Sequence, residues 1–193
     1  VKAFTAHAVL RIVLDEGLDL LASTGGEVEA CLRAGAPASR IVLHGNNKTE
    51  AELRYAFDSG VGHLILDSFD EIERADRLLD RPQRVLIRLT PGIKPSTHSY
   101  VQTGQLDSKF GFGLADGLAE RAVNRVRGSR HLELVGLHAH IGSQIFESGG
   151  FAEAARRAAA RSGDAGWDES CAPAAGNAFP RSRSYWFASS AAR

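Results

Sequence analysis

The chain has 193 residues, of which 44% are hydrophobic and 24% charged, and its formal net charge at pH 7 is zero. This composition is typical of a soluble globular domain, and the zero net charge argues against a general attraction to nucleic acid or membranes. No apolar run approaches the roughly 18–20 residues that span a bilayer, and no signal peptide opens the chain. Two cysteines, Cys31 and Cys171, make no metal or disulfide framework, so we expect a reduced, cytoplasmic enzyme.

The first 90 residues alternate short apolar runs with amphipathic segments. Amphipathic segments predict helices over residues 5–16, 27–34, 49–57 and 68–79, and a glycine follows each of the first three. Short apolar runs predict strands over residues 18–23, 40–43, 63–66 and 84–89. Thr49 with Glu52, and Ser68 with Glu71, have the spacing of a capping box at a helix N-terminus.

The pattern continues after a long polar, glycine-containing loop over residues 92–114, whose length suggests a function. A helix over 116–127 and a strand over 131–140 follow. Short buried strands alternating with helices predict an α/β fold with a parallel sheet. Because the polar Gly- and Asn-rich segments all follow strands, we predict a partial (β/α)8 TIM-type barrel that this chain does not close. An open doubly wound sheet is the alternative, although the chain has no Gly-x-Gly-x-x-Gly turn.

The two ends of the chain have unusual features. It begins at Val1 and contains no methionine, so we expect an N-terminal part to be missing. No Val, Leu or Ile occurs after Ile145, and residues 152–193 contain 14 alanines and 6 arginines. We therefore expect residues 1–150 to form the domain and 151–193 to be an atypical tail that supplies it with no strands. An out-of-frame reading of a GC-rich gene, an unrelated fused end or a disordered tail would each explain this composition.

The predicted strand at 131–140 ends in two histidines, His138 and His140, which at positions i and i+2 point to the same face. Gly142 after them allows the backbone to approach a ligand, and the Ser143 hydroxyl could hold an anion such as phosphate. Both histidines could equally be hydrogen-bonded core residues. An HxH metal site is a further alternative, which the absence of any histidine after His140 disfavours.

Nine segments in register resemble one family, the bacterial diaminopimelate decarboxylases, which are alanine-racemase-like enzymes with a pyridoxal phosphate (PLP) barrel domain. Together they cover about residues 1–150, and the segments at 44–48 and 97–98 point to the diaminopimelate branch rather than to ornithine or arginine decarboxylases. In chain order they are Lys2-Ala3-Phe4, Ser23-Thr24-Gly25-Gly26-Glu27, His44-Gly45-Asn46-Asn47-Lys48, Asp67-Ser68, Arg88-Leu89-Thr90-Pro91-Gly92, Thr97-His98, Thr103-Gly104, Lys109-Phe110-Gly111 and Gly136–Gln144.

The resemblance implies roles for three residues at the cofactor. Lys2 matches the lysine that forms the Schiff base with PLP, whereas the residues alone favour a frayed terminal lysine. His140 matches the histidine that lies against the PLP ring, and Ser143 matches a residue near the phosphate.

Five further residues have open assignments. Asn46 is either a cofactor-binding residue at the barrel mouth or part of a simple turn. Arg88 either binds an anion or makes a structural ion pair. His98 and Lys109 lie in the long loop, where they either recognise a substrate carboxylate or are solvated. Glu27 is interpreted as structural, since an acid is favourable in the first turn of a helix.

For the full-length family, the resemblance implies PLP-dependent decarboxylation of meso-2,6-diaminoheptanedioate to L-lysine by a homodimer, with no metal and no nucleic-acid or membrane partner. The family's glycine-rich phosphate loop, its Glu-Pro-Gly-Arg segment and its second domain do not appear in this sequence, so we expect the chain alone to be inactive. The alternatives are a non-catalytic PLP-binding barrel, a related ornithine- or arginine-type decarboxylase, and a relic that binds nothing.

Overall fold

The computed structural model describes residues 1–92, 110–140, 154, 156 and, as backbone, 185–188. The chain divides into two compact units, one made of residues 1–86 and 125–134 and the other of residues 87–124 and 135–193. Three of the predicted site residues, His98, Lys109 and Ser143, lie outside the described residues.

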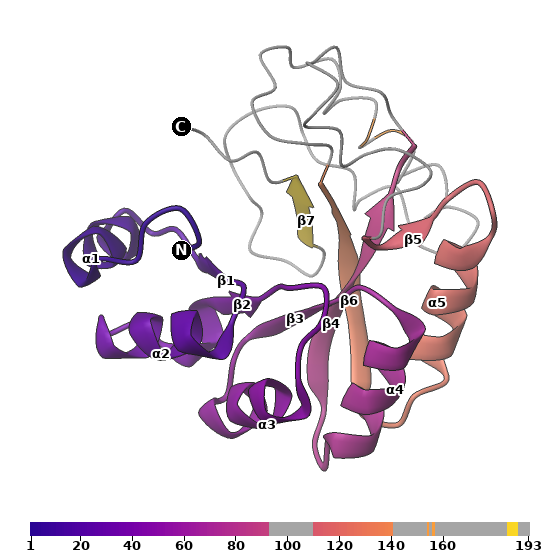
Figure 1. Cartoon of the computed structure of the whole chain (residues 1–193), viewed down its shortest axis with the longest axis horizontal. Coiled ribbons are helices and arrows are strands. Elements are labelled where there is room, and N and C mark those ends of the chain that lie inside the picture. Colours follow the sequence, from indigo (N-terminus) through magenta and orange to yellow (C-terminus); the bar gives the residue numbers. More distant parts are fainter. Residues whose placement is uncertain (93–109, 141–153, 155, 157–184, 189–193) are drawn as a thin grey trace. The chain divides into compact units, whose positions relative to one another are not determined.

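The first unit repeats a strand followed by a helix, as the sequence predicts. Its strands β1 to β3 are parallel neighbours, with Leu20 opposite Ile41 and Val42 opposite His63. Figure 1 shows α2, α3 and α4 along the outside of these strands. In chain order the elements are α1 (His7–Asp15), β1 (Leu20–Ala22), α2 (Gly25–Arg33), the short 3-10 helix η1 (Ala38–Arg40), β2 (Ile41–Leu43), α3 (Glu50–Ser59), β3 (His63–Leu66) and α4 (Phe69–Leu78).

The remaining elements are β4 (Gln83–Thr90), β5 (Phe112–Gly113), α5 (Leu118–Arg127), β6 (Leu132–Ala139) and β7 (Tyr185–Ala188). The strand order in the sheet is β1-β2-β3-β4-β6-β7, and β5 pairs with β4. Every strand pair with a described register is parallel. Because β1 and β7 stand at the two ends of this order, the sheet of the described residues is open. The predicted partial barrel is therefore confirmed.

The core of the first unit explains its sequence pattern. All residues of β2 and β3 are buried, which is expected of parallel strands covered on both faces and accounts for their lack of polar alternation. Each helix adds residues from one face, such as Leu53 and Ala56 of α3 and Ile72 and Ala75 of α4. Burying one large aliphatic side chain contributes roughly 1.5–3 kcal/mol, so these contacts dominate the stability of the unit.

Most predicted bounds differ from the observed ones by one or two residues, and the sequence does not predict strand β5. Helix α2 begins at Gly25 rather than at residue 27, because Thr24 caps the helix two residues earlier by accepting a hydrogen bond from the Glu27 N–H. Strand β5 lies inside the segment predicted as a loop over 92–114, and pairs Leu89 with Phe112.

The prediction that the C-terminal end supplies no strand is wrong. Strand β7 pairs in parallel with β6, from Gly136 opposite Tyr185 to Ala139 opposite Ala188. Its sequence is Tyr-Trp-Phe-Ala. The expectation counted only Val, Leu and Ile, whereas aromatic residues are also favoured on the pleated surface of a sheet. The boundary near residue 150 between domain and tail stays a prediction.

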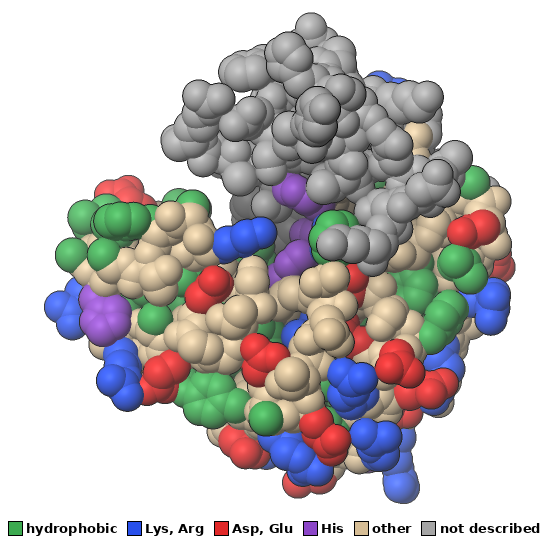
Figure 2. Space-filling view, in the orientation of Figure 1, with side chains coloured by type: hydrophobic (Ala, Val, Ile, Leu, Met, Phe, Trp, Pro, Cys, Tyr) green, Lys and Arg blue, Asp and Glu red, His purple; other side chains and the backbone are tan. Residues whose placement is uncertain are grey.

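The surface of the helices carries acidic and basic side chains intermixed, as Figure 2 shows. Several form ion pairs across one helical turn, namely Glu29–Arg33, Glu50–Arg54 and Asp70–Arg74. Such exposed pairs contribute about 0.3–0.5 kcal/mol each, and the intermixing agrees with the zero net charge. None of the helices in the described part of the chain has the length and apolar character needed to span a bilayer.

His63 makes the stability of the first unit depend on pH. It begins β3 and is 6% exposed. Burial lowers its pKa from the ordinary value of 6.5, the charge of Arg84 lowers it further, and Asp19 opposes the shift. Because the folded state binds the proton less well than the unfolded state, stability is present above pH 6.5 and is lost as the pH falls through the lowered pKa. We expect urea unfolding to show a smaller loss between pH 7 and pH 5 in His63→Gln than in the wild type.

A His7→Gln variant is the control, because His7 is exposed. It should follow the wild-type pH dependence. Parallel curves for the wild type and His63→Gln would contradict the assignment to His63.

Candidate functional site

Each of the first three strands is followed by a helix that begins with the same local motif. Thr24, Thr49 and Ser68 occupy the N-cap of α2, α3 and α4, and each side-chain oxygen accepts a hydrogen bond from the backbone N–H three residues later. In all three helices the residue at that position is a glutamate. The three donor–acceptor distances, for Glu27, Glu52 and Glu71 respectively, are 3.2, 3.2 and 3.3 Å.

The glutamates also bind outside their own helix turn. Glu52 completes the predicted capping box by accepting from the Thr49 N–H at 3.0 Å, and it accepts from the N–H of Gly25 in α2 at 3.1 Å. The Thr49 N–H and then the Gly25 N–H lower the pKa of Glu52, against the effect of burial. Glu27 accepts from the Ser23 N–H at 2.7 Å. The acids therefore hold the strand ends as well as the helices.

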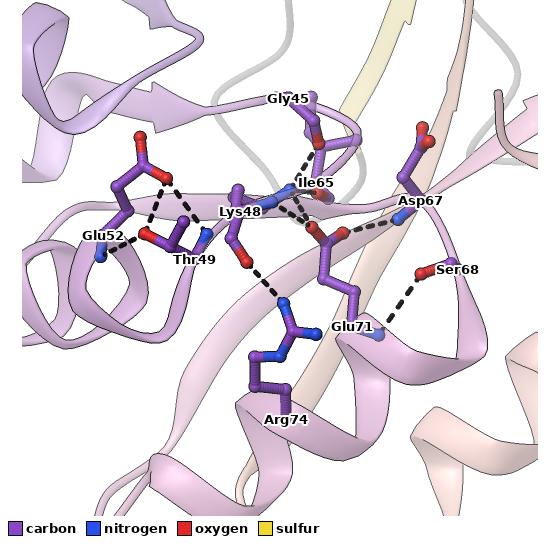
Figure 3. A network of polar contacts seen from close by, with 9 residues as sticks. All are labelled: Gly45, Lys48, Thr49, Glu52, Ile65, Asp67, Ser68, Glu71 and Arg74. Atoms are coloured by element: carbon purple, nitrogen blue, oxygen red, sulfur yellow. Dashed lines mark hydrogen bonds and ion pairs between the residues drawn. The ribbon is translucent and has the colours of Figure 1, made fainter.

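Lys48 and Glu71 form a buried ion pair where β2 and β3 end. The Lys48 Nζ lies 2.8 Å from Glu71 Oε1, and the two side chains are 1% and 3% exposed. The ammonium group also donates to the carbonyl oxygens of Gly45 and Ile65, both at 2.7 Å. Figure 3 shows these acceptors gathered around Nζ. Three acceptors match the three N–H donors of a lysine, which is what a buried charge requires.

Glu71 links this ammonium group to the backbone. Its Oε1 accepts from the Lys48 N–H at 3.3 Å and its Oε2 from the Asp67 N–H at 2.8 Å. The Arg74 Nη1 donates to the Lys48 carbonyl oxygen at 2.7 Å. The predicted capping box at Ser68 is thus half formed: the hydroxyl caps the helix, while the carboxylate turns to Asp67 and Lys48. The buried ammonium provides the physical reason, since a charge attracts the acid more strongly than a neutral N–H does.

Lys2 and Asn46 are the predicted site residues in the first unit. Lys2 lies in a turn before α1 and is exposed. The Val1 nitrogen donates to the Leu21 carbonyl oxygen at 3.0 Å, which holds this turn beside β1. No hydrogen bond or ion pair connects the Lys2 ammonium to another part of the described chain. Asn46 is exposed in the loop after β2.

The loop that carries Asn46 requires a glycine before it. Gly45 has a φ of 121°, and a Cβ at this position would lie 2.8 Å from the Ser23 carbonyl oxygen. Both the left-handed conformation and the close approach disfavour a larger residue, which would have to displace the loop. The loop therefore rests directly on the end of β1.

In the second unit, Arg88 is 5% exposed on β4, and its guanidinium lies 4.6 Å from the centre of the Phe110 ring. This is a cation–π contact, which neither of the two predicted interpretations of Arg88 included. The Thr90 hydroxyl donates to the Phe110 carbonyl oxygen. Phe110 thus holds the end of β4 by its ring and by its backbone.

The two histidines of the second unit differ in exposure. His138 is 1% exposed within β6, whereas His140 follows the strand end and is half-buried. Among the described residues, no group of three or more His, Cys, Asp and Glu side chains could hold a metal ion. In exposure, His140 is the better placed of the two to meet a ligand.

The described residues supply an amine, an imidazole and an amide, which are chemical groups suited to binding PLP. An exposed lysine amine without an ion-pair partner can condense with an aldehyde, and a half-buried imidazole can lie against an aromatic ring. Asn46 supplies an exposed amide that can donate and accept hydrogen bonds.

The interaction that the sequence does not reveal is the Lys48–Glu71 pair. Lys48 belongs to a segment that carries the family resemblance, but nothing in its spacing separates a buried lysine from a solvated one. The sequence offers one signal. Lys48 directly precedes the helix cap Thr49, and Glu71, the acid expected in the capping box of the next helix, follows it in the chain.

Comparison with known proteins gives a consistent result. A family described as pyridoxal-dependent decarboxylase, pyridoxal binding domain, matches residues 1–165. The chain is 49% identical over 159 residues to the diaminopimelate decarboxylase of Mycobacterium tuberculosis (strain ATCC 25618 / H37Rv), covering 81% of this chain and 36% of that protein. It is 44% identical over 155 residues to that of Staphylococcus aureus (strain COL), covering 80% and 37%. The chain thus spans little more than a third of these relatives.

Solved structures agree with this. The chain resembles diaminopimelate decarboxylase from Helicobacter pylori complexed with L-lysine with a TM-score of 0.76 and 28% identity, over 83% of this chain and 41% of that one. For the enzyme from M. jannaschii in co-complex with L-lysine the TM-score is 0.76 and the identity 26%, over 85% and 39%.

The link between α3 and α2 can be tested with Glu52→Ala. Removing the carboxylate leaves the Thr49 and Gly25 N–H groups without this acceptor, so we expect a loss of about 1 kcal/mol in the free energy of unfolding at pH 7. Because the pKa of Glu52 lies below its ordinary value of 4.5, the charged form stabilises the fold above pH 4.5. The difference from wild type should shrink as the pH falls through the lowered pKa, as measured by urea unfolding.

The matched control is Glu50→Ala, which removes the same charge from the same helix turn but breaks only exposed pairs, with Arg54 at 3.2 Å and with Arg77 at 3.7 Å. It should cost less than about 0.5 kcal/mol. Equal losses in the two variants would show that Glu52 acts only through its charge near the helix end.

Proposed function

This chain belongs to the pyridoxal-dependent decarboxylases through their pyridoxal-binding domain, and on that premise we propose that it binds PLP as part of an enzyme that decarboxylates meso-2,6-diaminoheptanedioate to L-lysine. The observation that carries the proposal is the similarity of four fifths of the chain to diaminopimelate decarboxylases. Two solved neighbours hold L-lysine, which is the product expected of this reaction.

We assign three residues to the cofactor. Lys2 would hold PLP through its amine, and its exposure and lack of an ion-pair partner among the described residues support this role. His140 would lie against the ring, and Asn46, in the loop after β2, would donate or accept a hydrogen bond. Ser143 is assigned to the phosphate from the resemblance alone.

Bound PLP supplies an electron sink for the electron pair that remains when the α-carboxylate leaves as carbon dioxide. The protein has to orient the substrate so that this carboxylate, and not the second one, departs. We assign recognition of the carboxylates to Arg88, His98 and Lys109, because a guanidinium can bind a carboxylate with two parallel hydrogen bonds. The Phe110 ring supports the role of Arg88 by restricting where its guanidinium lies.

We further propose that the full-length protein is a cytoplasmic homodimer, as the resemblance implies. Sedimentation of the full-length protein tests the oligomeric state.

The assignment of Lys2 is tested by chemical trapping. The chain contains four lysines, Lys2, Lys48, Lys94 and Lys109. Borohydride reduction of the PLP-loaded protein should attach a pyridoxyl group to Lys2, and peptide mass spectrometry should locate it there. Lys2→Ala should abolish the label, because the alternative lysine of the first unit, Lys48, is 2% exposed. A label on Lys94 or Lys109 would overturn the assignment, and no label would favour a protein that does not bind PLP.

The substrate is tested by the absorbance of the PLP-loaded protein. We expect meso-2,6-diaminoheptanedioate to shift the absorption band, because its amine would compete with the Lys2 amine for the cofactor, and ornithine and arginine to have a much smaller effect. Lys2→Ala is the control for amine exchange at this position. A larger response to ornithine or arginine would favour that branch of the family, and a response to none of the three would favour a non-catalytic PLP-binding barrel.

A further inference from the structure

Burying the Lys48–Glu71 pair costs desolvation free energy that formation of the local fold does not require. Taking a carboxylate and an ammonium out of water costs several kcal/mol for each ion, and apolar residues of similar volume are often as stable in such positions. Helix α4 has its own cap in Ser68 and does not need this carboxylate to begin. The position of the pair therefore needs an explanation other than stability alone.

On the lysine side, the pair controls the loop that follows β2. The Lys48 Nζ donates to the carbonyl oxygen of Gly45, three residues earlier, and so closes residues 45–48 into a compact loop. The same Nζ donates to the carbonyl oxygen of Ile65 in β3 and anchors the loop to that strand. Lys48 is buried, whereas Asn46 and Asn47 between the two anchors are exposed.

On the acid side, the pair controls the end of β3. Glu71 binds the Asp67 N–H at the first residue after β3 and the Lys48 N–H at the end of the β2 loop. Arg74 adds a hydrogen bond to the Lys48 carbonyl oxygen, as Figure 3 shows. The two loops that follow β2 and β3 are therefore joined through one carboxylate, at the carboxyl ends of the strands where barrel enzymes bind their ligands.

We propose that Lys48 and Glu71 are positioning residues for PLP: they fix the His44–Asn47 loop so that Asn46 meets the cofactor with its amide already in place. This rests on the proposed function, in which Asn46 binds PLP. Lys48 is 2% exposed and does not reach a ligand itself. It acts through the loop, which needs no reordering when the cofactor arrives.

The decisive variant is Lys48→Met/Glu71→Gln, which removes both charges but keeps similar volumes and an acceptor for the Asp67 N–H. Because no single buried charge is left behind, most of the stability should remain. The matched control is Arg54→Met/Glu50→Gln, which makes the same kinds of change at an exposed pair on α3 and also removes the exposed contact of Glu50 with Arg77. The urea midpoint, amide hydrogen exchange without cofactor, and the dissociation constant for PLP are measured for both variants.

We expect amide exchange at residues 45–48 to accelerate about tenfold in the Lys48→Met/Glu71→Gln protein, and the dissociation constant for PLP to rise by about the same factor, comparable to losing an outer-shell support at a metal site. The control should change each by less than about twofold. Unchanged PLP affinity in the buried-pair variant, with a wild type that binds PLP, would overturn the positioning role and leave only stability. A wild type that does not bind PLP would overturn the proposed function, and this role with it.

If the buried-pair variant does not fold, Gly45→Ala tests the same loop without touching the ion pair. A Cβ there meets the Ser23 carbonyl oxygen at 2.8 Å and must displace the loop. Gly35→Ala is its control, because Gly35 also has a positive φ, 93°, but a Cβ there meets nothing within 4 Å. We expect PLP affinity to fall in Gly45→Ala only. Equal affinities in the two variants would overturn the proposal.

Discussion

A lysine and a glutamate buried against each other hold the first unit together where β2 and β3 end. The Lys48 ammonium is surrounded by the carboxylate of Glu71 and by two backbone carbonyl oxygens, from Gly45 and Ile65. A charge in such a place is tolerated only when its donors are matched. Matching them forces the loop after β2 to fold back on the end of β3. The loop geometry therefore follows from the need to solvate one ion with protein groups.

Weaker interactions between carboxylates and backbone N–H groups occur at the helix N-termini that follow β1, β2 and β3. The N-termini of α2, α3 and α4 each carry a partial positive charge and unpaired N–H groups, and in each helix a glutamate lies three residues after the cap. Glu27 reaches the end of its own strand, Glu52 reaches the preceding helix at Gly25, and Glu71 reaches the preceding loop at Lys48. Successive strand–helix repeats are thus connected by carboxylates as well as by the apolar core. Because these contacts use backbone N–H groups, the exposed side chains of the loops can vary without breaking them.

Much of the fold was predictable because local signals agreed with one another. Strand β3 over His63–Leu66 has the predicted bounds, because its apolar run Leu64–Leu66 lies between Gly62 and the helix cap Ser68. The capping box of Thr49 and Glu52 formed as its spacing indicated. The error at β7 arose from a rule that overlooked aromatic residues, which pair in sheets as well as aliphatic ones do. The capping box expected at Ser68 formed only in part, because a long-range ion pair competed for the acid.

The sequence alone determined the alternation of strands and helices, the class of fold and the family resemblance, because these depend on periodicity and on residue order along the chain. It also indicated Lys2 and His140 as cofactor residues, through that resemblance. The tertiary structure alone decided which charges are buried and what they hold: Lys48 reads in the sequence as an ordinary loop lysine and becomes the anchor of two loops. The physical reason is that burial and partner distance are set by residues 17 to 23 positions away, Ile65 and Glu71, and no local pattern records whether such residues will meet.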